Sequence, residues 1–287
     1  MPLFDWFRRT HESATEATVN GVTMRYRDEG QGEPILLIHA FPLSSAMWED
    51  QIDALATRFR VIAPDLRGFG ATARGSGITS LDQAADDLAA LLDHLNLKTV
   101  TVAGLSMGGY IAFALLRRHP ANVARLVLAD TRAGADSPEA QHAREQNAQL
   151  AEREGAAAVA EQMLPKLLSA QADAAVRDEV RKIAAANDRA GVAAALRAMA
   201  ARPDSTPDLA TITVPTLIIV GAEDVLTPPA EARAMHAAIA NSQLLEIPQA
   251  GHLANLEAPD AFSTAIEEFV GGRQALGRAG GGLAGQW

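Results

Sequence analysis

The chain has 287 residues, of which 48% are hydrophobic, and its formal net charge is −10. This length is enough for one substantial buried core. The acidic balance argues against nucleic acid and anionic membranes as partners, because both are bound through clustered Lys and Arg. Cysteine is absent, which excludes disulfides, thiolate nucleophiles and Cys-based zinc sites.

The start of the chain does not have the pattern of a secretory signal. Residues 1–9 place an acid among apolar side chains and two arginines after them, whereas a signal has its basic residues first. No apolar run approaches the length of a membrane span. We therefore expect an N-terminal leader over residues 1–17, no membrane partner and a cytoplasmic location.

Residues 18–130 predict a sheet of alternating strands and helices. Asn20-Gly21 separates two strand-like runs, which indicates an antiparallel hairpin at the start. The following runs are apolar on both faces and alternate with helix-like segments, the pattern of a parallel sheet covered on both sides. The predicted strands are residues 34–39, 60–64, 99–103 and 123–129.

The strand pattern stops after residue 130 and returns at residue 210. Residues 131–209 are rich in Ala, Glu, Arg and Gln and contain no aromatic residue, which predicts an all-helical lid insertion. A helical part of the main core is the alternative. Residues 210–270 complete the α/β core with two strands (214–220 and 243–247) and an amphipathic helix (260–270). Residues 271–287 form a predicted flexible, Gly-rich tail.

Gly104-Leu105-Ser106-Met107-Gly108 follows a predicted strand and opens a predicted helix over residues 111–118. Gly-x-Ser-x-Gly in this position is typical of a nucleophile elbow, where the serine occupies a sharp turn and the glycines avoid collisions. The helix N-terminus directs unpaired N–H groups toward the site, so the N–H of Met107 is a candidate oxyanion donor. The alternative is a Gly-rich turn with an idle serine.

A serine hydroxyl needs a base to remove its proton. Of the seven histidines, His252 directly follows the last predicted strand, at the edge of the sheet where catalytic groups collect. His39 ends a strand well before the serine. We predict His252 as the base, with a surface histidine as the alternative.

The imidazole in turn needs a carboxylate to orient it. Asp224 lies in the segment after the strand that ends at Val220, and it gives the chain order Ser, Asp, His. Its neighbour Glu223 and Asp130, at the end of an earlier strand, are alternatives. A further alternative is that Asp224 has no catalytic role and is a surface carboxylate that caps a helix.

A second oxyanion donor is expected in the loop after His39, and the N–H of Phe41 is our candidate because Pro42 has none. Phe41 and the nearby Trp48 also suit plain core packing. Apolar residues of the predicted lid indicate an aliphatic pocket for short to medium esters. The predicted substrate-binding residues are Trp48, Met163, Leu164, Leu167 and Met199, with Leu168 on the same apolar stripe.

With these residues in place, the chain resembles the α/β-hydrolase superfamily, and within it the lidded esterase, enol-lactonase and cofactor-free haloperoxidase branch. Five stretches in the family's order carry the resemblance: residues 39–42 with Trp48, 63–70, 104–109, 221–228 and 251–252. One departure is Ala40, where relatives commonly have Gly.

The resemblance implies an α/β-hydrolase fold, with a mostly parallel central sheet flanked by helices and an all-helical lid. It implies Ser106 as nucleophile, Asp224 as acid and His252 as base, with oxyanion donors at Phe41 and Met107. Asp65 would hold a turn. Relatives that cleave carbon–halogen bonds use an aspartate at the elbow, so a serine there argues against that activity.

The predicted function is hydrolysis of a small-molecule ester through an acyl-enzyme, with no cofactor and no metal. No His-based zinc motif, phosphate loop or dinucleotide fingerprint occurs. Two alternatives remain: a lactonase or perhydrolase/haloperoxidase with the same triad, and a small-molecule binding protein or receptor on the same scaffold.

Overall fold

A computed structural model describes residues 15–72 and 77–272. The predicted hairpin is present: β1 (Thr15–Val19) pairs antiparallel with β2 (Val22–Glu29), and Asn20 and Gly21 have φ of 46° and 75°. Residues 15–17, predicted as leader, belong to β1 because they extend this pairing as far as Tyr26. Residues 1–14 of the leader and 273–287 of the predicted tail lie outside the described residues.

Within the described ranges, eight strands form one sheet in the order β1-β2-β4-β3-β5-β6-β7-β8. The pairs β1–β2 and β2–β4 are antiparallel, and all others are parallel. The strands after the hairpin are β3 (Pro34–Ile38), β4 (Arg60–Pro64), β5 (Val100–Leu105), β6 (Val123–Ala129), β7 (Thr216–Gly221) and β8 (Ser242–Ile247).

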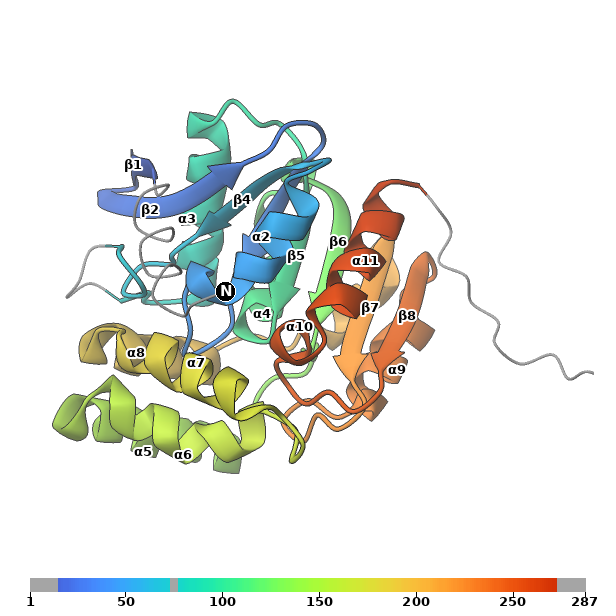
Figure 1. The fold of residues 1–287 in the computed structure, drawn as a ribbon. Helices are drawn as coiled ribbons and strands as arrows, with labels where there is room; N and C mark the ends of the chain where they lie inside the picture. The colour runs from blue at the N-terminus through green and yellow to red at the C-terminus, as the bar shows by residue number, and fades with distance from the viewer. Residues whose placement is uncertain (1–14, 73–76, 273–287) are drawn as a thin grey trace, which may run out of the picture.

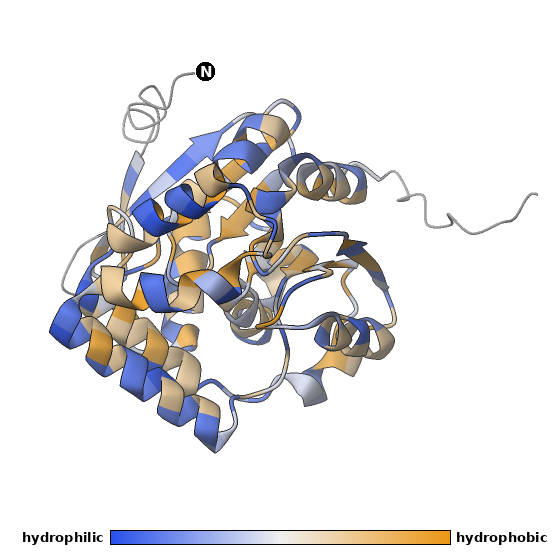
Figure 2. Ribbon diagram, turned by 60° about the horizontal axis from the view of Figure 1, so that its bottom comes forward, coloured by the Kyte–Doolittle hydropathy of each residue, from blue (hydrophilic) through white to orange (hydrophobic). Residues whose placement is uncertain are grey.

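Helices cover both faces of the sheet (Figure 1). In β3, Leu36 and Ile38 point into one apolar cluster, and Ile35 and Leu37 point into the other. This explains why the strands are apolar throughout their length. The first cluster lies under α3 (Leu81–His94), α4 (Met107–Arg118) and α9 (Pro229–Ala238), and the second under α2 (Glu49–Leu55) and α11 (Pro259–Val270). Figure 2 shows the apolar strands enclosed by helices of mixed hydropathy.

Between β6 and β7 the chain is helical and adds no strand to the described sheet. Its helices gather on one side of the molecule (Figure 1), with α5 packed on α8 and α6 on α7. We call residues 131–209 the lid. Its helices are α5 (Pro138–Glu154), α6 (Ala156–Leu167), α7 (Ala174–Ala185) and α8 (Arg189–Ala200).

Short elements complete the described fold. These are α10 (Ala254–Glu257) and the 3₁₀ turns η1 (Ser45–Trp48), η2 (Pro120–Asn122) and η3 (Thr206–Thr211). None of the helices in the described ranges combines the length and the apolar character that crossing a bilayer requires.

Candidate active site

Ser106 lies in the turn between β5 and α4 with φ 55° and ψ −111°, a left-handed conformation that residues with a side chain rarely adopt. A Cβ at Gly104 would lie 2.2 Å from the carbonyl oxygen of Gly108. A Cβ at Gly108 would lie 2.2 Å from the carbonyl oxygen of Ile38 in β3. The neighbouring backbone therefore leaves no room for a side chain at either glycine, which is the physical basis of the motif.

His252 follows β8 and Asp224 follows β7, so both reach the same edge of the parallel sheet as Ser106. Nε2 of His252 lies 2.8 Å from Oγ of Ser106. Nδ1 of His252 lies 2.8 Å from Oδ2 of Asp224. The three side chains are buried, and the geometry fits a neutral imidazole that accepts from the hydroxyl and donates to the carboxylate.

The carboxylate of Asp224 has further donors. Its Oδ1 accepts from the N–H groups of Leu226 (2.7 Å) and Thr227 (3.0 Å), and its Oδ2 accepts from Oγ1 of Thr227 (2.6 Å). Burial raises the pKa of Asp224, but the hydrogen bond and charge of His252 and the Thr227 bonds outweigh it, so the pKa is lowered. Thr227 had no predicted role. It directly follows Leu226, whose N–H forms an Asx turn with Asp224, and an Asp at the start of such a turn is a signal in the sequence.

The two alternative acids occupy different surroundings. Glu223 is exposed. Asp130 is fully buried at the end of β6; its Oδ1 accepts from the N–H of Gly221 (2.7 Å), and its Oδ2 has no partner among the described residues. Burial, followed by the charge of Asp224, raises the pKa of Asp130 well above its usual range. The geometry pairs His252 with Asp224 rather than with either alternative.

The candidate oxyanion donors lie on adjacent elements. Met107 is the first residue of α4, so its N–H has no acceptor within the helix. Phe41 lies in the loop after β3, and the close contact of Gly108 with the end of β3 brings that loop beside the start of α4. In the same loop, both ring nitrogens of His39 bond the backbone. Its Nδ1 lies 3.0 Å from the carbonyl oxygen of Ala40, and its Nε2 accepts from the N–H of Leu66.

Asn187, between α7 and α8, joins the lid to this loop. Its Nδ2 donates to the carbonyl oxygen of Pro42 (2.6 Å), and its Oδ1 accepts from the N–H of Gly70 (2.8 Å). We did not predict this residue. In the sequence it stands next to Asp188, whose side chain caps α8, so the local pattern indicates only a helix start.

Asp65 forms the turn that the resemblance implies. Its Oδ1 accepts from the N–H of Ser45 (2.8 Å), and its Oδ2 accepts from the N–H of Ala71 (2.8 Å). Gly70 has φ 53° and no space for a Cβ, which would lie 2.2 Å from the Asp65 carboxyl. Asp65 thus holds the loop to which Asn187 is bonded.

The predicted pocket residues of α6 lie beside the histidine loop. The carbonyl oxygen of Leu167 accepts from the N–H of Leu253, at 3.0 Å, one residue beyond His252. Leu164 and Leu167 are buried and Met163 is half-buried. This end of α6 therefore lies directly against the loop that carries the base.

The other two predicted pocket residues have different neighbours. Trp48 is fully buried, and its ring packs 5.9 Å from that of Phe262 in α11, which is the core-packing alternative. Met199 is buried in α8, where its sulfur lies 3.5 Å from Nη1 of Arg144 in α5.

A serine hydroxyl bonded to an imidazole, which is itself bonded to a carboxylate, has the arrangement of an activated nucleophile. The adjacent helix N-terminus adds backbone donors for a developing negative charge. In residues 15–72 and 77–272, no group of three or more His, Asp or Glu side chains is placed to hold a metal ion.

Comparison with known proteins agrees with this fold. A family model for the alpha/beta hydrolase fold matches residues 33–259. 3-Oxoadipate enol-lactonase 2 of Acinetobacter baylyi is 31% identical over 258 residues, covering 88% of this chain and 95% of that protein.

Two solved structures are also similar. A thermophilic esterase from Thermogutta terrifontis has a TM-score of 0.87 and 40% identity, covering 91% of this chain and 99% of that one. The enol-lactonase from Burkholderia xenovorans LB400 has a TM-score of 0.82 and 32% identity, covering 90% and 100%. The chain belongs to the α/β-hydrolase family.

Proposed function

We propose that this chain is a serine carboxylic-ester hydrolase that acts on short- to medium-chain esters through an acyl-enzyme. The observation that carries the proposal is the continuous hydrogen-bonded series from Ser106 through His252 to Asp224. The 40% identity to a protein described as an esterase supports ester hydrolysis as the reaction class.

In the first half of the reaction, Oγ of Ser106 attacks the ester carbonyl carbon while Nε2 of His252 takes its proton. The N–H groups of Met107 and Phe41 bind the oxyanion of the tetrahedral intermediate. Asp224, ionised because its pKa is lowered, stabilises the imidazolium that forms. The imidazolium then protonates the leaving alcohol, and the acyl group stays on the serine.

In the second half, water replaces the alcohol. Nε2 of His252 accepts a proton from the water as its oxygen attacks the acyl carbon, and the same proton returns to Oγ of Ser106 when the acid leaves. The lid contributes the aliphatic residues Leu164 and Leu167 near the histidine loop, which suits a short aliphatic acyl or alcohol group.

The decisive experiment compares hydrolysis of p-nitrophenyl butyrate by the wild type and by Ser106→Ala. We expect kcat to fall by about 10⁴- to 10⁶-fold, with an unchanged circular dichroism spectrum. Ser263→Ala is the matched control, because Ser263 is also buried but its hydroxyl is bonded to Gln51 in the core. Equal activity in Ser106→Ala and the wild type would reject the proposed nucleophile.

An acyl-length series then tests the substrate range. We expect kcat/KM to be highest for short to medium aliphatic acids. A preference for bulky aromatic acids would contradict the assignment of an aliphatic pocket.

Lactone opening is the second candidate, because two enol-lactonases are 31% and 32% identical to this chain. The same three residues would attack a cyclic ester, and the alcohol would remain attached to the acyl product. Comparing kcat/KM for a lactone and for the open ester of the same acid separates the two. A clear excess for the lactone would replace the esterase assignment.

A further inference from the structure

A second group of charged residues, two of them buried and two partly buried, lies where the lid joins the core. Asp136 precedes α5 and Arg202 follows α8, so the two residues lie at opposite ends of the lid helices. Oδ1 of Asp136 lies 2.7 Å from Arg132 and 2.9 Å from Arg202, and its Oδ2 is bonded to Arg144. We call these four residues the hinge cluster.

The hinge cluster carries more positive than negative charge. Three guanidinium groups share the one carboxylate of Asp136, whose side chain is fully buried. Burial raises the pKa of Asp136, but Arg144 and Arg202 outweigh it and lower the pKa, so the carboxylate is ionised. Glu231 lies within electrostatic range of Arg132 but forms no ion pair with it among the described residues. Arg202 and Asp136 are buried, whereas the side chains of Arg132 and Arg144 are 25% and 20% exposed. A surplus of positive charge at such a partly buried site favours the binding of an anion.

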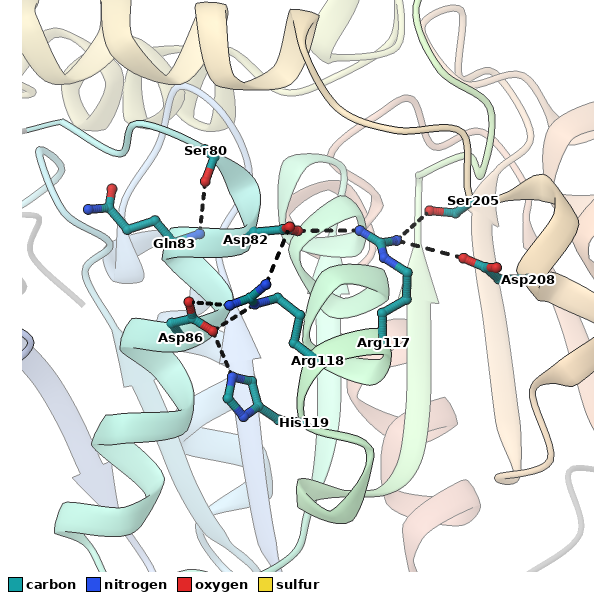
Figure 3. Close-up of polar contacts among 9 residues, drawn as sticks. All are labelled: Ser80, Asp82, Gln83, Asp86, Arg117, Arg118, His119, Ser205 and Asp208. Atoms are coloured by element: carbon teal, nitrogen blue, oxygen red, sulfur yellow. Dashed lines mark hydrogen bonds and ion pairs between the residues drawn. The ribbon is translucent and has the colours of Figure 1, made fainter.

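Arginines nearby do not show this surplus. Figure 3 shows Arg117 between Asp82 and Asp208, while Arg118 makes two 2.7 Å bonds to Asp86. There, acids at least match the arginines in number. The hinge cluster departs from the pattern of the adjacent surface.

Two donors of the hinge cluster are also unused. The Nε atoms of Arg132 and Arg202 are buried and have no hydrogen-bond partner within the described part of the chain. The side chain of Arg202 is only 3% exposed, and its other nitrogens bond Asp136 and the carbonyl oxygens of Met199 and Gly134. Buried guanidinium donors normally have acceptors, so these two point to an occupant.

Both arginines line the same small pocket. Its volume is about 10 Å³, room for one water-sized particle, and its wall also includes Tyr110 and Arg117. The Cζ atom of Arg202 lies 4.2 Å from the centroid of the Tyr110 ring, which covers one side of the guanidinium. A small pocket of this kind suits a single small particle, a water or a halide ion, and the positive charge around it favours the halide.

We propose that this pocket binds one small monovalent anion of the size of chloride, through the Nε–H groups of Arg132 and Arg202. Such an anion would neutralise part of the surplus and bridge the segment after β6 to the segment after α8. It would hold the two ends of the lid together without contacting the reacting groups.

The first test is thermal unfolding at constant ionic strength with sodium gluconate replaced stepwise by sodium chloride. An ion that binds only the folded state raises Tm in a saturable way, by about 3–5 °C at tenfold excess over Kd for a domain of this size. Gluconate is too large for the pocket and serves as the reference anion. Equal Tm values in the two salts would overturn the proposal.

Substitutions of the two arginines test whether the chloride-dependent rise in Tm comes from this pocket. Arg132→Gln and Arg202→Lys each remove one Nε–H donor, and we expect the chloride-dependent shift to disappear in both. Arg197→Gln is the control, since Arg197 lies on α8 but pairs with exposed Glu145 and Glu152, and it keeps the shift. A full chloride shift in Arg132→Gln would contradict the assignment.

A crystal of the wild type grown with sodium bromide provides a readout independent of the variants. We expect one anomalous peak between the two Nε atoms. Water density there without an anomalous signal would overturn the proposal.

Discussion

The core and the lid hold their functional side chains in different ways. In the core, Ser106, Asp224 and His252 each lie in the segment after a strand, and the imidazole of His252 bonds both of the other two side chains. The lid contacts the same site through three residues: Asn187 bonds the loop after β3, the N–H of Ser169 donates to Glu257 beside Gly251, and the carbonyl oxygen of Leu167 accepts from Leu253. A substitution in the core therefore removes a reacting group, whereas one in the lid displaces groups that remain present.

Asp224→Asn tests the core side of this comparison and has the largest expected effect. The amide cannot stabilise the imidazolium and favours the wrong tautomer, so we expect kcat to fall by about 10⁴-fold. Steady-state kinetics with p-nitrophenyl butyrate measures this. Activity within a few-fold of the wild type would mean that another carboxylate supports His252.

Asn187→Ala tests the lid side. It leaves the carbonyl oxygen of Pro42 and the N–H of Gly70 without their partner, and we expect kcat to fall by about tenfold while KM changes less. Asn187→Asp is the matched variant, because it keeps the acceptor for Gly70 and loses the donor to Pro42. If the loop carrying Phe41 is what Asn187 positions, Asn187→Asp lowers kcat as much as Asn187→Ala does. A fall in Tm with unchanged kcat in both variants would show a purely structural role.

Asp130→Asn has the smallest expected effect on activity. It tests whether Asp130, like Asp224, takes part in the reaction. The pKa of Asp130 is raised in the folded state, so ionisation favours the unfolded chain once the pH exceeds the ordinary Asp pKa of about 3.9. Asn does not titrate. We therefore expect the variant to have a higher Tm than the wild type at pH 7, and this advantage to vanish near pH 4.

The measurement is Tm against pH for both proteins, together with kcat at neutral pH. We expect kcat to stay within a few-fold of the wild type. A loss of activity comparable to that of Asp224→Asn would identify Asp130 as part of the reacting unit.

Features with local causes could be predicted from the sequence. The Asn20-Gly21 turn and the glycines around Ser106 follow from backbone sterics within a few residues. His252 could be placed because it directly follows an apolar strand. The sequence favours Asp224 over Asp130, but both follow strands, and what distinguishes them in the structure is the bond of Asp224 to His252 and the donors of Thr227.

Contacts between distant segments could be predicted only where a motif and the edge of the sheet bring the residues together, as for Ser106 and His252. Asn187 is 145 residues from Pro42, and nothing near either residue indicates that they meet. In the same way, Arg132 and Arg202 look like ordinary charged residues of helical segments, and their shared carboxylate is visible only once the lid has folded back on the core. These contacts are set by how the lid packs on the core, which local patterns do not encode.

The close contact at Gly251 has a consequence for exchanging parts between relatives. A Cβ there would lie 2.5 Å from the backbone nitrogen of Ser169, so the turn after α6 and the loop of His252 share one fitted surface. A chimera that receives a foreign lid would need a helix end of matching shape at this glycine. The lid is thus not freely exchangeable. Replacing it would change the position of His252 as well as the shape of the pocket.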